Sequence, residues 1–261
     1  MYPTCLCDEQ WHLLKPILDS YGLLKQKTHH PMRNILSGIF YVLDNGVKWM
    51  ALPREFPPLK TVNWYFNKWS HCGLWLRISL AMTEITRILE GREASPSLSS
   101  IDSQSQSGEP GILDRGLDGN KKVNGRKRHI AVDSLGLLLI CICTAANVAD
   151  SVTGRILAGI LNCQDQFPRI AKILGDSVYG SLTNFRVPVT VESSLRKKGQ
   201  KGFIPEAFRW AVERTFAWLN RCRRLVRNYE KNPLHQESMN YIANIRLCLK
   251  RMLKGMADDS R

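Results

Sequence analysis

The pattern of apolar residues changes near residue 92, and this change limits the possible fold more than any other feature of the 261-residue chain. Before it, apolar side chains recur with helical spacing, as in the segment 8–18. A linker rich in Ser, Glu and Pro follows at 90–100, and after it short apolar runs alternate with turn signals, as expected of strands. We therefore predict a small all-helical N-terminal domain over 1–92, an α/β domain over 97–254 and a tail over 255–261.

The N-terminal part predicts three short helical segments. Asp8 is placed to cap the first, the second ends near Asn45-Gly46, and the third begins at Thr61 after a proline-rich break. Short helices joined by turns suit a helix-turn-helix module, or a small bundle whose aromatic residues form its core. We assign Trp64 and Trp69 to that core.

The part after the linker predicts an α/β fold of the ribonuclease-H-like type. Its elements are three strands, a helix, two further strands and then helices, an order typical of that fold. In chain order we expect a short strand ending at Asp102, strands at 128–133 and 135–148, a helix at 152–163, strands at 169–176 and 187–192, a long helix at 208–226, and an amphipathic helix around 242–253.

Charge distinguishes the two parts of the chain. Lys and Arg number 37 against 23 acidic residues, a formal net charge of +14, and residues 1–100 account for only +3 of it. A basic excess concentrated in one part favours a polyanionic partner, most commonly nucleic acid. The sequence has no run long and apolar enough to span a bilayer and no secretory signal pattern, which predicts a cytoplasmic, nucleoid-associated protein without a membrane partner.

The eight cysteines and six histidines do not predict a structural metal site. The cysteines include no C-x-x-C pair, and the histidines form no H-E-x-x-H pattern. In a cytoplasmic chain, such cysteines are expected to be reduced thiols.

Carboxylates at the ends of strands are the candidates for chemistry. Phosphodiester hydrolysis by two metal ions needs a cluster of carboxylate oxygens, the ligands that Mg²⁺ prefers. Asp102 follows a short apolar strand, Asp176 ends the segment IAKILGD, and Glu213 lies on the long predicted helix among several arginines. Each also has an ordinary explanation as a turn former, a helix cap or the partner of an arginine. Four other carboxylates stay open as candidates: Asp118, Asp133, Asp150 and Glu192. A turn role is enough to explain Asp133, and N-capping of a helix is enough to explain Asp150.

Five motifs resemble those of a known family: IDSQS around Asp102, GNKKVNGRKRHIAVDSLGLLL, AANVADS, GDSVYG around Asp176, and RWAVERTFAWLNRCRRL around Glu213. They are similar to the DDE transposases of bacterial insertion sequences, in particular those of the insertion-sequence-five type. The segments DEQWHLLKPIL and NILSGIFYVLDNGVKWMALPREFPPLKTVNWYFNKW resemble the helical DNA-binding segment of the same group. The resemblance covers nearly the whole chain and selects Asp102, Asp176 and Glu213 as the catalytic residues.

The family motif around the glutamate reads Tyr, two residues, Arg, three residues, Glu, six residues, Lys. Arg209 and Glu213 match this motif, whereas Glu206 stands at the Tyr position and Asn220 at the Lys position. Arg221 follows Asn220 directly, and the resemblance implies that it takes over the DNA contact of the missing lysine.

The resemblance implies the activity of a DNA transposase. Such an enzyme binds the ends of its insertion element, cuts them by metal-dependent phosphodiester hydrolysis and joins the 3′-hydroxyl to target DNA, in cut-and-paste transposition. Asp102 is then expected to bridge two Mg²⁺ ions, which Mn²⁺ can replace, with Asp176 binding one ion and Glu213 the other. The resemblance also implies a homodimer or larger assembly on double-stranded DNA. The segment GNKKVNG lacks a G-K-[ST] ending, so no nucleotide cofactor is expected.

Two sets of residues are predicted to contact DNA. The phosphate contacts come from a basic loop before the central strands and from arginines around Glu213: Lys121, Lys122, Arg126, Lys127, Arg128, Arg209, Arg221 and Arg224. The base contacts come from a predicted recognition helix at 61–69, through Thr61, Asn63, Asn67 and Lys68. For the basic loop, and for a second basic segment at 196–201, the alternative is a solvated run of charges without a partner.

Two other functions stay open at this point. One is a non-catalytic DNA-binding regulator descended from a transposase, and the other is a structure-specific nuclease of the same fold that joins no strands. The three carboxylates argue against the first, and an assay of DNA joining separates all three.

Overall fold

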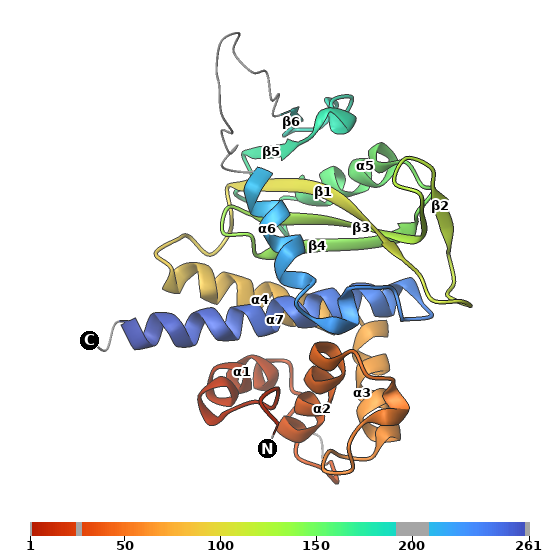
Figure 1. Cartoon of the computed structure of the whole chain (residues 1–261). Helices are drawn as coiled ribbons and strands as arrows, with labels where there is room; N and C mark the ends of the chain where they lie inside the picture. Colours follow the sequence, from red (N-terminus) through yellow and green to blue (C-terminus); the bar gives the residue numbers. More distant parts are fainter. Residues whose placement is uncertain (1, 25–27, 192–208, 259–261) are drawn as a thin grey trace. The chain divides into compact units, whose positions relative to one another are not determined.

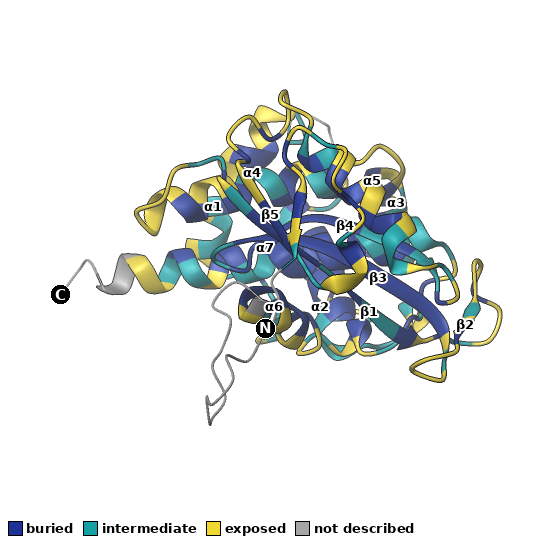
Figure 2. Ribbon diagram, turned by 90° about the horizontal axis from the view of Figure 1, so that it is seen from above, coloured by how far each residue is buried: buried dark blue, intermediate teal, exposed yellow. Residues whose placement is uncertain are grey.

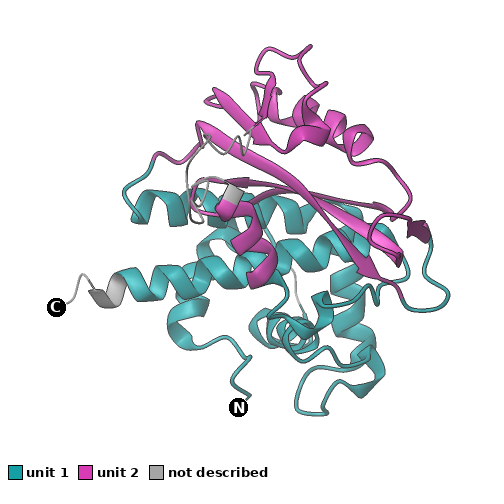
Figure 3. Ribbon diagram, turned by 45° about the horizontal axis from the view of Figure 1, so that its top comes forward, with its two compact units in different colours: residues 1–92, 109–113, 219–261 teal, residues 93–108, 114–218 magenta. Residues whose placement is uncertain are grey.

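The structure, a computed structural model, describes residues 2–24, 28–191 and 209–258 (Figure 1). The chain forms two compact units, each built from segments that are distant in the sequence (Figure 3). The first unit comprises residues 1–92, 109–113 and 219–261, and the second comprises 93–108 and 114–218. The C-terminal part of the region predicted as one α/β domain therefore groups with the N-terminal helices.

The first unit is helical, as predicted for the N-terminal part. Its elements are α1 (Asp8–Ser20), α2 (Met32–Asn45), η1 (Trp49–Ala51), α3 (Leu59–His71), α4 (Leu74–Leu89), η3 (Arg223–Leu225) and α7 (Pro233–Asp258). Cys7, not Asp8, is the N-cap of α1: its Sγ accepts a hydrogen bond from the Gln10 backbone N–H, and the Cys7 backbone N–H donates to Gln10 Oε1. The predicted end of α2 is confirmed by Gly46, whose φ of 67° ends the helix in the left-handed conformation.

The predicted C-terminal amphipathic helix, α7, completes the core of this helical unit. Ile242, Ile245 and Leu249 are buried along one face of α7. Asn244 donates hydrogen bonds to two hydroxyls of α4, those of Ser79 at 2.9 Å and Thr83 at 3.0 Å. The helix runs to Asp258 and so extends into the predicted tail.

The second unit is a mixed six-stranded sheet with helices. Its strands are β1 (Leu98–Ser107), β2 (Gly116–Asp118), β3 (Val123–Asp133), β4 (Leu138–Ala145), β5 (Lys172–Gly175) and β6 (Val189–Val191). β3 pairs antiparallel with β1 and with β4, and β5 pairs parallel with β1 and with β6. The short β2, which the sequence did not predict, pairs antiparallel with β3. The helical elements are α5 (Asp150–Leu161) between β4 and β5, η2 (Ser177–Tyr179) after β5, and α6 (Arg209–Leu219).

The predicted long helix at 208–226 is shorter in the structure. α6 ends at Leu219, and residues 223–225 form the separate turn η3. Among the helices of the described residues, none combines the length and the apolar character needed to cross a membrane.

The basic segment 121–128 is only partly a loop, and the prediction of a basic loop is wrong for Arg126, Lys127 and Arg128. These three residues lie in β3, which is buried from residue 125 to its end (Figure 2). Arg126 pairs across to Gln106 of β1 and to Ala145 of β4, so the strand is flanked on both sides. Because side chains alternate along a strand, Lys127 points to the opposite face from its two neighbours.

Candidate active site

The sheet register brings Asp102 and Asp176 together. In the parallel pair of β1 and β5, Ser100 lies opposite Leu174; Asp102 follows two residues later in β1, and Asp176 follows two residues later, directly after the end of β5. Neighbouring strands lie about 4.8 Å apart. The two aspartates line one small cavity of about 20 Å³, together with Ser100, Ile101, Leu174, Gly175 and Val212.

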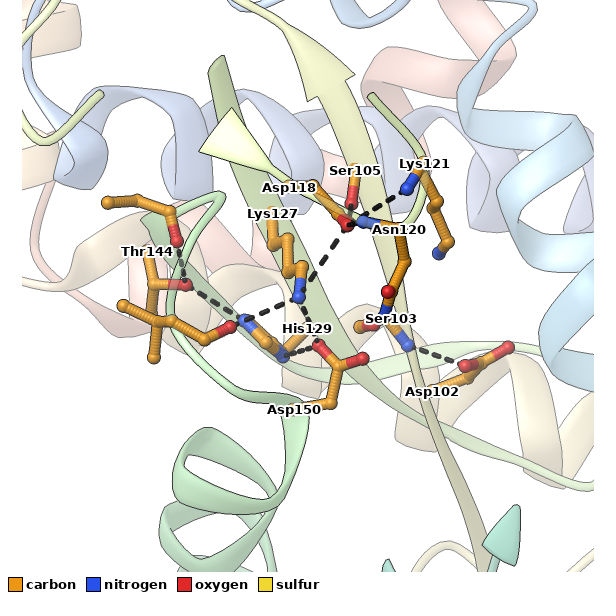
Figure 4. A network of polar contacts seen from close by, with 12 residues as sticks. Asp102, Ser103, Ser105, Asp118, Asn120, Lys121, Lys127, His129, Thr144 and Asp150 are labelled. Atoms are coloured by element: carbon orange, nitrogen blue, oxygen red, sulfur yellow. Dashed lines mark hydrogen bonds and ion pairs between the residues drawn. The ribbon is translucent and has the colours of Figure 1, made fainter. Parts of the chain in front are cut away.

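Each of the two carboxylates is held by a backbone N–H group close to it in the chain. The Ser103 backbone donates to Asp102 Oδ1 at 2.7 Å (Figure 4). The Val178 backbone donates to Asp176 Oδ1 at 3.1 Å, so that Asp176 caps the turn η2. Both aspartates are half-buried and remain open to solvent on one side. They are therefore oriented by the chain and still accessible to a ligand.

Glu213 lies next to this cavity but does not line it. Its neighbour Val212 is buried and forms part of the cavity wall, whereas Glu213 is exposed on α6. Two contacts fix α6 against the β3–β4 turn: Thr215 Oγ1 donates to the Gly136 carbonyl at 2.7 Å, and Arg214 Nη2 donates to the Leu135 carbonyl at 2.9 Å. Two of the three predicted carboxylates, those of Asp102 and Asp176, therefore line the cavity, whereas the third, Glu213, is the neighbour in sequence of a lining residue.

The donor set of the cavity suits a hard divalent cation. Its two carboxylates offer oxygen ligands, and no thiolate or imidazole lies among its lining residues. Across the described parts of the chain, no group of three or more His, Cys, Asp and Glu side chains is arranged to hold a metal ion. A complete site of three carboxylates would need Glu213 to turn toward Asp102 and Asp176.

Three of the four alternative carboxylates have structural tasks. Asp133 is fully buried, and its Oδ1 accepts from the backbones of Leu135 and Leu137, which confirms its turn role. Asp118 accepts from the Ser105 hydroxyl and from the backbone of the turn that follows it. Asp150 is the first residue of α5, not its N-cap, and forms an ion pair with a lysine of β3. Glu192 lies outside the described residues.

A buried polar network on β3 was not foreseen from the sequence (Figure 4). Lys127 Nζ lies 3.0 Å from Asp150 Oδ1 and 3.7 Å from Asp118 Oδ2. His129 Nε2 lies 2.9 Å from Thr144 Oγ1, and burial lowers the pKa of His129 to about 4, so this imidazole is neutral at pH 7. Lys127 and His129 are two positions apart in one predicted strand region, and this spacing was the signal that could have indicated that both side chains lie on the same face of the strand.

The structure divides the predicted phosphate contacts into exposed and buried residues. Lys121 and Lys122 are exposed in the turn before β3, and Arg221 is exposed after α6. Arg126 and Arg128 are 0% and 1% exposed, which is incompatible with phosphate contact. Arg128 Nη2 instead donates to Gln104 Oε1 of β1, and Lys127 is the ion-pair partner described above.

Arg224 is also buried, so its predicted DNA contact is wrong. Its Nε lies 2.7 Å from Glu230 Oε1, and its Nη1 donates to the Val47 carbonyl at 2.9 Å. Arg209 begins α6, but its side chain lies outside the described residues, as do Glu206 and the basic segment 196–201.

The predicted recognition helix corresponds to α3. Lys68 is exposed and its Nζ lies 4.7 Å from the ring centroid of Trp64, while Thr61 and Asn63 are half-buried. Asn63 Oδ1 accepts a hydrogen bond from Asn67 Nδ2 at 2.8 Å. Trp69 lies in the core as predicted, at 2% exposed, but the prediction for Trp64 is wrong, because its ring is 52% exposed.

Comparisons with known proteins agree with the resemblance of the motifs. The family model described as "Putative transposase of IS4/5 family" matches residues 6–79, and two models described as "Transposase DDE domain" match residues 93–200 and 185–250. A "Putative transposase for insertion sequence element IS402" from Burkholderia cepacia is 32% identical over 125 residues, which cover 41% of this chain and 54% of that protein. The chain thus spans about half the length of this relative. No significantly similar solved structure was found.

The α/β unit that holds Asp102 and Asp176 overlaps the regions matched by the transposase DDE models. With the N-terminal match added, the chain is similar to the putative transposases of the IS4/5 family over residues 6–79 and to transposase DDE domains over 93–200 and 185–250.

Proposed function

We propose that this chain is a DNA transposase that binds the ends of its insertion element, cuts them and joins the 3′-hydroxyl to target DNA. The observation that carries the proposal is that Asp102 and Asp176, which are far apart in the sequence, line the same cavity, because β1 pairs with β5. The strand order, with antiparallel β4, β3 and β1 followed by parallel β5 and β6, supports a ribonuclease-H-like fold for this unit. The transposase descriptions of the matched family models and of the relative support the activity.

Asp102, Asp176 and Glu213 are the residues we assign to two Mg²⁺ ions, or Mn²⁺ in their place. When bound, such ions activate water and stabilise the oxygen that leaves the phosphodiester. β1, which carries Asp102, lies between β3 and β5, and Asp176 directly follows β5; this central position suits Asp102 as the shared ligand. The hydrogen bonds from Ser103 and Val178 orient the two aspartates before any ligand arrives.

The DNA contacts that we propose are those made by exposed residues. Lys121, Lys122 and Arg221 remain candidates for phosphates, and Arg209 is assigned on its motif alone. On α3, Lys68, Asn63 and Thr61 are the polar residues proposed to reach base edges, which makes α3 the recognition helix of a helix-turn-helix module. We further propose that the chain acts as a homodimer on paired element ends, as the family resemblance implies.

The test is a joining assay with labelled ends and a plasmid target, run on single substitutions. Asp102→Asn, Asp176→Asn and Glu213→Gln each remove a charged ligand with little change of shape, so each should abolish cleavage and leave DNA binding intact. Asp165→Asn is the matched control, because Asp165 is an exposed aspartate of the same unit, and it should keep full activity.

The same assay separates the alternatives. Binding of element ends without cleavage under any metal condition would identify a regulator, and cleavage without joining would identify a nuclease. Full activity of Asp176→Asn would remove Asp176 from the proposed site.

A further inference from the structure

One side of α4 is apolar and yet exposed in the described part of the chain. The other side is buried, and Asn244 of α7 donates hydrogen bonds to it (Figure 1). On the outer side, Ile85, Ile88 and Leu89 are all exposed, and Ile88 is the most exposed of them at 57%. Ala81, Ile85 and Ile88 follow the helical spacing of three and four residues, so they form one stripe. A helix that is apolar on both sides is typical of one that is covered on both sides.

The stripe continues at the start of α4 with an aromatic residue. Tyr21, directly after α1, is exposed, and its hydroxyl donates to the Arg77 carbonyl at 3.4 Å. The Arg77 guanidinium lies over the Tyr21 ring, 5.6 Å from its centroid. An exposed apolar surface therefore runs from Tyr21, beside the start of α4, to Ile88 near its end.

Two opposite charges lie on the same stripe. Arg77 and Glu84 are both exposed and seven positions apart, which is close to two helical turns, so they share one face of α4. At about 1.5 Å of rise per residue they are too far apart to pair within one helix. Among the described residues, Glu84 has no ion-pair partner, and partial burial raises the pKa of its carboxyl above the ordinary value. A cation brought next to Glu84 would stabilise its charged form.

We propose that this stripe is the surface through which two copies of the chain associate, with their α4 helices antiparallel about a two-fold axis near Ala81. In a two-fold interface the same patch faces itself, so residues at equal distances before and after the axis lie opposite each other. Arg77 of one copy then faces Glu84 of the other, twice in each interface. Tyr21 of one copy lies toward the end of α4 that carries Ile88 in the other. The small side chain of Ala81 at the centre lets the two helices approach closely.

A second copy fits this surface better than DNA does. The stripe is self-complementary, because its two opposite charges lie at equal distances from its centre. A phosphate backbone would be repelled by Glu84 and would gain little from the aliphatic side chains. The inference rests on the proposed function, since it assigns the contact surface of the proposed homodimer.

The test is sedimentation of the full-length protein over a range of concentrations, with thermal melting measured in parallel. Ile88→Asp places a charge in the stripe, so it should raise the dissociation constant of the dimer more than about 30-fold and leave the melting temperature unchanged. Val226→Asp is the matched control, because Val226 belongs to the same unit and is 58% exposed, against 57% for Ile88. It should associate as the wild type does.

Reversal of the two charges tests the antiparallel arrangement. Arg77→Glu and Glu84→Arg should each raise the dissociation constant more than about 10-fold, because each puts two pairs of like charges into the interface. The double variant restores both pairs with the charges exchanged, so it should associate nearly as the wild type does. Weaker DNA binding in Arg77→Glu with unchanged association would instead assign the stripe to DNA and overturn the inference.

The outcomes distinguish this inference from the proposed function. Wild-type association in Ile88→Asp, no recovery in the double charge reversal, or a wild type that is monomeric at every concentration would overturn the α4 interface. Cleavage and joining by the wild type would then still support the proposed function. Absence of cleavage by the wild type would overturn the proposed function, whereas the sedimentation of the variants would still decide the interface.

Discussion

Replacing Lys127 by Met tests the most unexpected feature of the structure, a lysine buried in the middle of a sheet. The Lys127 side chain is 9% exposed, and its Nζ is paired with Asp150 and Asp118 and donates to the Val148 carbonyl at 3.1 Å. Methionine has a similar shape but cannot pair, so the substitution leaves two carboxylates without their cation. Breaking a buried pair by removing one partner costs about 3 to 5 kcal/mol.

For Lys127→Met, we expect a loss of stability at the lower end of that range. Asp118 is almost fully buried, with its side chain 6% exposed, but the Asp150 side chain is 24% exposed and water screens part of its charge. We therefore expect Lys127→Met to lower the free energy of unfolding of the sheet by about 3 kcal/mol. A lysine in a solvated loop, as the sequence predicted, would change it by less than about 0.5 kcal/mol.

Amide hydrogen exchange of β3 peptides is the appropriate assay, because it reports the opening of this strand separately from the helical unit. A loss of about 3 kcal/mol corresponds to roughly 150-fold faster exchange of the protected amides. Lys121→Met, in the exposed turn just before β3, is the matched control and should change exchange by no more than about twofold. Adding Asp118→Asn to Lys127→Met should recover part of the loss, since it removes an unpaired buried charge. Exchange in Lys127→Met within about twofold of the wild type would refute the buried ion pair.

Three further predictions concern charge. The double variant Lys121→Ala, Lys122→Ala should bind DNA of any sequence more weakly, and the slope of log affinity against log salt concentration should become shallower by about 1.8 in titrations at several salt concentrations. An unchanged slope would show that this turn is a solvated surface without DNA contacts. The pKa of His129 in the folded chain, about 4, lies below its ordinary value of 6.5, so the unfolded chain binds this proton first and stability should fall as the pH drops from 6.5 toward 4. Denaturation curves of His129→Gln at several pH values should lack this fall in stability, and an unchanged pH dependence would assign it to other groups. Arg224→Leu should lower stability by leaving Glu230 buried without its cation, and a normal melting temperature with a reduced salt slope would restore Arg224 as a DNA contact.

The sequence alone determined the kind and order of most elements. The helices of the N-terminal part, the strand-helix-strand order after the linker and the end of α2 at Gly46 were predicted because each depends on residues within a few positions of one another. The position of Asp176 directly after β5 followed from the same local patterns, whereas the predicted end of the first strand at Asp102 was wrong, because β1 continues to Ser107. The resemblance to DDE transposases was also readable from local motifs.

What only the tertiary structure decided is which distant residues meet. The burial of Lys127 in β3 depends on Asp118 and Asp150, since a lysine can be buried only where carboxylates from elsewhere in the chain compensate its charge. Trp64 and Trp69 share one helix and one residue type, yet packing leaves the first exposed and buries the second.

The proximity of Asp102 and Asp176 was also decided only by the tertiary structure. Their shared cavity depends on the register of β1 against β5, which is fixed by a crossover connection through α5 and cannot be read from either strand. The grouping of α7 with the N-terminal helices likewise depends on polar partners more than 150 positions away, such as Ser79 and Thr83 for Asn244. Local periodicity specifies which face of an element is apolar, but the partner that covers the face is selected only when the whole chain competes for the same buried surface.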